Sequence, residues 1–154
     1  MDVIMANIDE LNKAADKVFL ALDAYREARG EGHDGIAGVV SSVMNRVARP
    51  SWWGNDVLSV IFKKWQYSSM TNPKDGQLVV WPQRTAPEWT DCLQIASDAV
   101  DGILANPVPS ADSYYDISIP APKWATPETF VKQIGKLRFY NLDHDVEIAK
   151  GGIG

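Results

Sequence analysis

The feature that most constrains the fold of this chain is a pair of apolar runs at helical spacing. The glycine-rich segment 30–35 separates the two runs. Asn7 followed by Glu10 has the form of a capping box, and Gly30 can adopt the left-handed conformation that closes a helix. We therefore predict a first helix over about 8–29. Its packing stripe consists of Leu11, Ala14, Ala15, Val18, Leu22 and Tyr25.

The second run predicts another helix directly after the glycines. Asp34 is placed to cap it, and Pro50 ends it after Arg46 and Arg49 have put positive charge near its C-terminus. Its apolar stripe consists of Ile36, Val39, Val40, Val43, Met44 and Val47.

The rest of the chain alternates turn signals with shorter periodic runs. We predict helices over 55–63, 85–103 and 127–135, an irregular excursion over 64–84 with a short strand at 77–81, and two strands over 112–119 and 136–142. The last two strands alternate in polarity and can pair antiparallel. The expected fold class is α+β, mainly helical with a small antiparallel β-sheet.

Length and composition predict one domain. A chain of 154 residues can bury a sizeable core, and neither a repeat nor a linker divides it. We expect a single monomeric domain over 1–154, with its core at about 8–143 and a frayed tail at 144–154. The chain shows no secretory signal and no apolar run near the ~20 residues that cross a bilayer, so we expect it to be made in the cytoplasm.

Charge and residue inventory exclude several kinds of function. The net charge of −5 argues against nucleic-acid and anionic membrane partners, because both need a clustered Lys/Arg surface. A catalytic zinc needs about three protein ligands, and His33 and His144 lie far apart without ligand spacing. The one cysteine, Cys92, cannot form an internal disulfide and lies in a predicted helix as a core residue. We therefore expect no metal and no cofactor.

Glu27, near the end of the first predicted helix, is the first candidate for chemistry. At 100° per residue it lies opposite the packing stripe, beside Leu20 and Asp23, and periodicity alone assigns it to a solvated outer face. If Glu27 and Glu31 both line a cleft, their repulsion and partial desolvation raise the pKa of one carboxyl group. A raised pKa is a condition for a general acid.

The segment around Glu27 resembles a family signature. "YREARGE" at 25–31, "GIAGVV" at 35–40 and "NRV" at 45–47 are similar to the motif of the cell-wall hydrolase family that includes the SleB-type spore cortex-lytic enzymes and related phage endolysins. Weaker similarities follow in order over residues 18–142: "WQYSS" at 65–69, "SADSYYD" at 110–116, "PKWA" at 122–125 and "IGKLRFYN" at 134–141.

The resemblance implies a small lysozyme-like domain that cleaves the β-1,4 bond between N-acetylmuramic acid and N-acetylglucosamine in peptidoglycan. It also implies that Glu27, the glutamate of the "EARGE" motif, is the catalytic residue. Relatives often carry a histidine near 114–116, where this chain has Tyr114-Tyr115-Asp116. The expected partner is therefore the glycan strand of a bacterial cell wall.

Two mechanisms fit a single acidic residue of this kind. A hydrolase adds a second carboxylate, for which Glu31, Asp112 and Asp116 are available. A lytic transglycosylase does not need one, because the muramic 6-hydroxyl attacks its own C1, and the resemblance favours this route. The alternatives are a lysozyme-type hydrolase, a non-catalytic peptidoglycan-binding module and a structural component of a phage particle.

Aromatic and amide side chains in the irregular segments are the candidates for substrate binding. We predict contacts from Gln66, Tyr67 and Ser68 in the excursion, together with Tyr115 and Trp124. The resemblance and the missing signal together favour a phage endolysin. Such a protein waits in the host cytoplasm until another protein opens the membrane to the cell wall.

Overall fold

The computed structural model of the chain describes residues 2–143, so the predicted tail at 144–154 lies outside the described residues. Its helices are α1 (Val3–Ala28), α2 (Gly32–Ala48), α3 (Val57–Ile61), α4 (Ser68–Thr71) and α5 (Pro87–Val100), with 3-10 turns η1 (Gly76–Val79) and η2 (Pro127–Thr129). Its strands are β1 (Ser113–Asp116), β2 (Phe130–Ile134) and β3 (Leu137–Tyr140). The expected α+β class with a small antiparallel sheet is confirmed.

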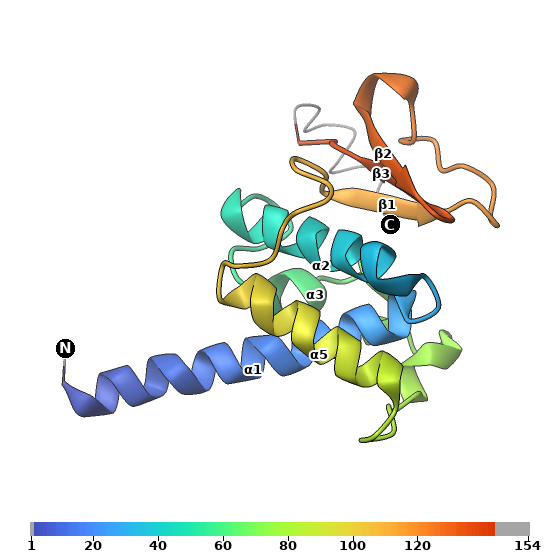
Figure 1. Cartoon of the computed structure of the whole chain (residues 1–154). Coiled ribbons are helices and arrows are strands. Elements are labelled where there is room, and N and C mark those ends of the chain that lie inside the picture. Colours follow the sequence, from blue (N-terminus) through green and yellow to red (C-terminus); the bar gives the residue numbers. More distant parts are fainter. Residues whose placement is uncertain (1, 144–154) are drawn as a thin grey trace.

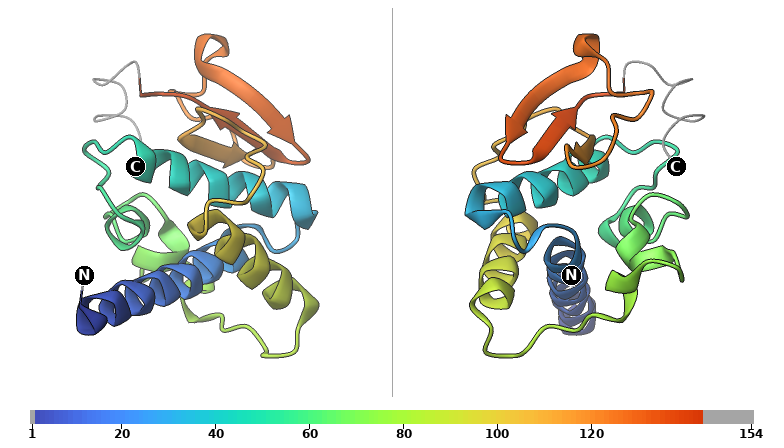
Figure 2. Two further views of the ribbon diagram at one scale, coloured as in Figure 1. Left: turned by 60° about the vertical axis from the view of Figure 1, so that its left-hand side comes forward. Right: turned by 90° about the vertical axis from the view of Figure 1, so that its right-hand side faces the viewer.

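The helix α2 lies in the middle of the molecule. On one side it packs against α1 and α5, and on the other side the three-stranded sheet covers it (Figure 1, Figure 2). Buried valines of α2 meet Leu20 and Ala24 of α1 and Phe139 of β3 in one core: Val39, Val40 and Val43. Because α2 is covered on both faces, it fixes the position of the sheet relative to the end of α1.

Gly38 lets α2 approach the sheet closely. A Cβ atom at this position would lie 2.7 Å from Cζ of Phe139 and 3.3 Å from Cδ1 of Ile134. Phe139 is fully buried, so its ring has no free space into which it could move. The glycine in the middle of this helix therefore sets the spacing between α2 and β3.

The predicted helix ends need three corrections. The first helix begins at Val3, where Asp2 accepts a hydrogen bond from the backbone N–H of Met5, so Asn7 is an interior residue. The left-handed glycine between α1 and α2 is Gly32, with a φ of 74°, and not Gly30. Asp34 lies in the first turn of α2 and does not cap it. Each error shifts a helix end and leaves the helix itself in place.

The predicted packing stripe of α1 is only partly correct. Leu11 and Val18 are exposed, whereas Leu20 and Asp23, which the prediction placed on the outer face, are fully buried. The second half of α1 contacts α2, α3, α4 and α5, so it is covered on several sides. Helical periodicity identifies one apolar face, and it cannot reveal that a polar face is covered as well.

In the C-terminal third, the predicted antiparallel pairing is confirmed and one helix is wrong. Strand β1 pairs antiparallel with β3, from Ser113 opposite Tyr140 to Asp116 opposite Leu137. The predicted helix at 127–135 is instead the turn η2 followed by β2, and the predicted strand at 77–81 is largely η1. Pro127 opens a short turn as expected, but the following residues Phe130–Ile134 join the sheet beside β3.

Candidate active site

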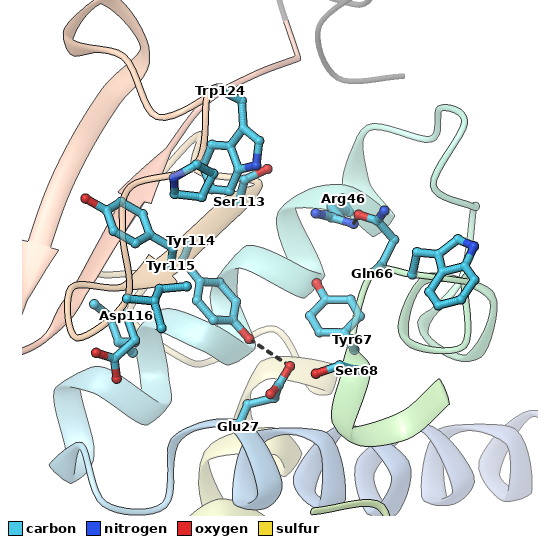
Figure 3. A pocket seen from close by; sticks show the side chains of 14 residues that line it. Glu27, Arg46, Gln66, Tyr67, Ser68, Ser113, Tyr114, Tyr115, Asp116 and Trp124 are labelled. Carbon is cyan, nitrogen blue, oxygen red and sulfur yellow. Dashed lines mark hydrogen bonds between the residues drawn. The ribbon is translucent and has the colours of Figure 1, made fainter. Parts of the chain in front are cut away.

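A pocket of about 420 Å³ opens between the end of α1 and the two segments that face it. One wall comes from residues 65–68, and the other comes from β1 and the loop after it (Figure 3). The lining side chains belong to Glu27, Arg46, Trp65, Gln66, Tyr67, Ser68, Ser113, Tyr114, Tyr115, Asp116, Ile119, Pro122, Trp124 and Leu137. Glu27 is the residue that α1 contributes to this lining.

Glu27 lies at the floor of the pocket between its two walls. From the sheet side, the hydroxyl of Tyr114 donates a hydrogen bond to Oε1 of Glu27 over 3.4 Å (Figure 3). From the other side, Tyr67 and Ser68 face the same carboxyl group. The carboxyl group is therefore partly buried, held by one hydrogen bond and open to a ligand that enters the pocket.

The surroundings of Glu27 favour its protonated form. Burial, and after it the negative charge of Asp75, raise the pKa of Glu27 to about 7, although the hydrogen bond from Tyr114 opposes the rise. The sequence suggested Glu31 as the neighbouring negative charge, and Asp75 takes this role instead. About half of the Glu27 side chains therefore carry a proton at neutral pH.

Asp23 lies one helical turn before Glu27 and is fully buried. Burial and the neighbouring Glu27 raise the pKa of Asp23 well above its usual value, against the opposing charges of Arg46 and Arg26. Asp23 and Glu27 are therefore two neighbouring carboxyl groups whose surroundings both favour the protonated form.

Arg46 of α2 holds both walls of the pocket. Its Nε donates to the backbone oxygen of Asp112 over 2.7 Å, just before β1, and Nη1 donates to Oε1 of Gln66 over 3.2 Å. The guanidinium also lies over the rings of Trp53 and Tyr67. The preceding residue, Asn45, donates to the backbone oxygens of residues 108 and 111. The cation is buried, and each of these contacts fixes a segment distant in sequence.

The structure brings most of the predicted site residues together. Gln66, Tyr67, Ser68, Tyr115 and Trp124 all line the pocket that contains Glu27. Tyr115 stacks on Tyr140 and meets the edge of Trp124. Trp124 is only 8% exposed, so it presents one edge to the pocket.

Glu31 does not line this pocket. It lines a shallower hollow together with Glu27, Arg29 and Gln77. Its carboxylate lies against the β2–β3 turn, where a side chain added at Gly135 would come within 3.3 Å of Oε2. Glu31 is therefore outside the lining of the main pocket, and its role as second carboxylate stays a prediction.

The other two carboxylates suggested as a second catalytic group differ from each other. Asp112 is buried and accepts hydrogen bonds from Ser113 and from the backbone N–H groups of Leu142 and Asp143. These contacts make it a structural residue. Asp116 lines the pocket, and the hydrogen bond from the backbone of Ser118 lowers its pKa, so it is ionised at neutral pH.

Four residues that affect the site were not predicted as part of it. Arg46 was considered only as positive charge near the end of the second predicted helix, and Tyr114 only as a departure from the family pattern. Asp75 lies 48 residues from Glu27 in the sequence, and no local pattern connects the two. Trp65 is 57% exposed at the pocket edge, and its positive φ of 70° is a signal that only coordinates reveal.

No metal group or membrane span is found in the part of the chain that the structure describes. Between residues 2 and 143, His, Cys, Asp and Glu side chains do not gather into a set of three or more that could hold a metal ion. Within the same range, no helix has both the length and the hydropathy that crossing a bilayer requires.

The site and the fold define a class of protein. A carboxylic acid with a pKa near neutrality, in an open pocket with aromatic and amide side chains on a small helical α+β domain, is typical of a glycosidase site. The sequence profile of the Cell Wall Hydrolase family matches residues 30–140, and the chain belongs to this family.

Solved structures and curated sequences agree with this family. The catalytic domain of the germination-specific lytic transglycosylase SleB from Bacillus anthracis is 28% identical, with a TM-score of 0.64 over 82% of this chain and 93% of that one. The catalytic domain of the Bacillus cereus SleB protein is also 28% identical, with a TM-score of 0.65, over 82% of this chain and 89% of that one. The lysozyme-like fold expected from the resemblance is thereby confirmed.

The curated relatives are considerably longer than this chain. The spore cortex-lytic enzyme of Bacillus subtilis is 29% identical over 135 residues, which cover 88% of this chain and 40% of that protein. The spore cortex-lytic enzyme of Halalkalibacterium halodurans is 29% identical over 126 residues, which cover 82% of this chain and 34% of that protein. The chain thus spans well under half of the length of these two relatives.

The electrostatics of Glu27 can be tested without any assumption about function. We expect Asp75→Asn to lower the pKa of Glu27 from about 7, because it removes a negative charge that disfavours the carboxylate. We expect Tyr114→Phe to raise this pKa, because it removes a hydrogen bond to the ionised form. The measurement is the NMR titration of the Glu27 carboxyl carbon.

Asp34→Asn is the matched control for this titration, since it removes one negative charge at an exposed position of α2 that does not line the pocket. The control is expected to leave the Glu27 titration unchanged. Equal shifts in Asp75→Asn and Asp34→Asn would mean that the overall net charge, and not the position of Asp75, sets the pKa.

Proposed function

We propose that this chain is a peptidoglycan-cleaving enzyme of the lytic transglycosylase type that cuts the β-1,4 bond between N-acetylmuramic acid and N-acetylglucosamine. The observation that carries the proposal is the position of Glu27 at the floor of an open pocket, in surroundings that raise its pKa to about 7. Membership of the Cell Wall Hydrolase family and the similarity to SleB catalytic domains support the choice of peptidoglycan as substrate.

In this mechanism one residue performs both proton transfers. Protonated Glu27 donates its proton to the glycosidic oxygen while the bond from that oxygen to muramic C1 breaks. The 6-hydroxyl of the same muramic residue then bonds to C1, and the Glu27 carboxylate accepts the hydroxyl proton. The result is an anhydro sugar, a free N-acetylglucosamine end and a Glu27 that is protonated again. No water molecule is consumed.

The two walls of the pocket would bind the glycan strand on either side of Glu27. Gln66 and Ser68 offer polar groups from one wall, and Tyr115 and Trp124 offer aromatic surface from the other. Tyr114 holds the acid through its hydrogen bond and stabilises the carboxylate that forms after proton donation. The exposed ring of Trp65 extends the first wall outward as a platform for a further sugar.

A second candidate is a lysozyme-type hydrolase of the same bond. Asp116 favours it, because an ionised carboxylate in the pocket of Glu27 could serve as nucleophile or as the base that activates water. The non-catalytic alternatives, a peptidoglycan-binding module or a phage structural component, would use the same pocket without needing a protonated Glu27. The next two experiments distinguish these possibilities.

Loss of the acid should abolish cleavage. We expect Glu27→Gln to reduce the lysis rate of purified cell walls at least about a hundredfold, because a general acid contributes about 10² to 10⁴ in rate. Glu31→Gln, the matched control with the same chemical change outside the pocket, should keep at least about half of the wild-type rate. Turbidity measures lysis, and EDTA is expected to leave the wild-type rate unchanged.

The folded state of the Glu27→Gln variant can be checked in the same experiment. The pKa of Glu27 is raised from its usual 4.5 to about 7, so native-state stability falls as pH rises through this window. Because glutamine does not ionise, the Glu27→Gln variant does not lose stability in this way. Its free energy of unfolding at pH 8 should exceed that of the wild type by up to about 3 kcal/mol. Wall lysis above about a tenth of the wild-type rate in a folded Glu27→Gln protein would refute the assignment.

The products decide between transglycosylase and hydrolase. Mass spectrometry of a wall digest is expected to show muropeptides that end in anhydromuramic acid, with no mass added for each bond cut. Hydrolysis would instead add one water, about 18 Da, to each cut, as expected when a second carboxylate activates water. In that case Asp116→Asn should abolish cleavage, whereas a transglycosylase should tolerate this change.

We further propose that the protein acts as a phage endolysin that stays in the host cytoplasm until the membrane is opened. The similarity of the "EARGE" segment to phage endolysins supports this proposal. Expression of the chain alone in a bacterial cytoplasm is then expected to leave cells intact. Co-expression with a membrane-permeabilising protein should lyse them, and Glu27→Gln should prevent this lysis. Lysis by the chain alone would contradict the proposed localisation.

A further inference from the structure

The first half of α1 extends away from the rest of the molecule. Residues 3–14, here called the N-terminal arm, project beyond the other helices (Figure 1). Every residue from 2 to 14 is exposed, and the ion pair between Lys17 and Asp101 of the segment after α5 marks the place where α1 joins the body. The arm also lies outside the family match at 30–140.

The arm carries an apolar stripe with the spacing of a coiled-coil seam. Ile4, Ile8, Leu11, Ala15 and Val18 follow one another at intervals of four, three, four and three residues. Within the arm, Ile4 is 71% exposed, Ile8 42% and Leu11 60%. Side chains with this spacing lie along one line of a helix, and Ile4, Ile8 and Leu11 stay exposed in the part of the chain that the structure describes.

The charges of this helix are confined to the face opposite the stripe. At 100° per residue, the charged residues of the first 17 fall between about 120° and 240° from Ile4: Asp2, Asp9, Glu10, Lys13, Asp16 and Lys17. The positions that flank the stripe hold Val3, Met5, Asn7, Asn12 and Ala14. A helix that is merely solvated has no reason to separate its residues in this way.

We propose that the N-terminal arm is a dimerisation surface and that a second copy of this chain covers it, stripe against stripe. A two-fold symmetric interface places the same patch on both partners, so the patch must be complementary to itself. An apolar stripe with uncharged flanks meets this condition, because two copies meet without any like charges facing each other. The proposal replaces the monomer expected from the sequence.

A lipid surface is a poorer occupant of the stripe. Helices that lie on membranes carry an excess of Lys and Arg on their polar face, which is attracted to anionic lipid. The polar face of this arm instead has four acidic residues against two lysines through residue 17, and the whole chain carries −5. Its charge would therefore oppose binding to an anionic bilayer.

Sedimentation equilibrium of the full chain tests the proposal. Because the contact spans only about two heptads, we expect a dissociation constant within the range of about 5 to 200 µM. At the upper end of this range, the measured mass of the wild-type protein should approach twice the mass of one chain. Ile8→Glu with Leu11→Glu should raise the dissociation constant at least about a hundredfold, because both side chains leave an apolar contact and charge enters it. The exposed positions of both residues should keep the fold and the cleavage of soluble glycan unchanged.

Lys13→Glu is the matched control, since it changes the net charge by the same −2 but lies on the opposite face of the arm. This variant should dimerise like wild type. A wild-type chain that stays monomeric up to about 200 µM overturns the proposal, and binding of that monomer to phosphatidylglycerol vesicles would assign the stripe to a membrane. A dimer that survives the Ile8/Leu11 double change overturns it too, because the arm would then not be the interface.

Discussion

A single buried cation, the guanidinium of Arg46, connects the parts of this molecule that form the pocket. It is 3% exposed, and its hydrogen bonds reach the start of β1 on one side and Gln66 on the other. Both walls are short irregular or edge segments with few regular backbone hydrogen bonds of their own. Without Arg46 the buried backbone oxygen of Asp112 would lose this hydrogen bond, at about 1–3 kcal/mol, and the walls would lose their common support. The position of the walls relative to Glu27 therefore depends on α2.

The sequence predicted the long helices and the central strand pair because their signals are local and repeated. The second half of α1 was placed correctly in the chain, but only one of its buried faces was predicted, since its surroundings come from four other helices. The segment Phe130–Ile134 was predicted as helix because Pro127 is a strong start signal, and the β3 strand beside it decided otherwise. Only contacts between distant segments could have corrected either prediction.

In the candidate site, too, residues with a local sequence signal could be predicted, whereas contacts between distant segments could not. Gln66, Tyr67 and Ser68 could be selected because they lie in an irregular segment with polar and aromatic side chains, and Glu27 because its motif resembles a family signature. The charge that tunes Glu27 could not be selected, because Asp75 reaches the acid only after the chain has folded back on α1 through η1. Motifs identify the groups that perform chemistry, whereas the pKa of each group depends on tertiary neighbours.

The close approach at Gly38 has a consequence for how this domain can vary. The missing side chain sets the distance between α2 and Phe139, and the neighbour of Phe139 across the sheet is Tyr114, whose hydroxyl reaches Glu27. A larger residue at 38 would push β3 outward, and β1 would carry the tyrosine away from the acid with it. A position that does not line the pocket thus acts as a spacer for the carboxyl group of Glu27. Any variant of this domain that keeps the hydrogen bond from Tyr114 to Glu27 must also keep a residue without a side chain at position 38.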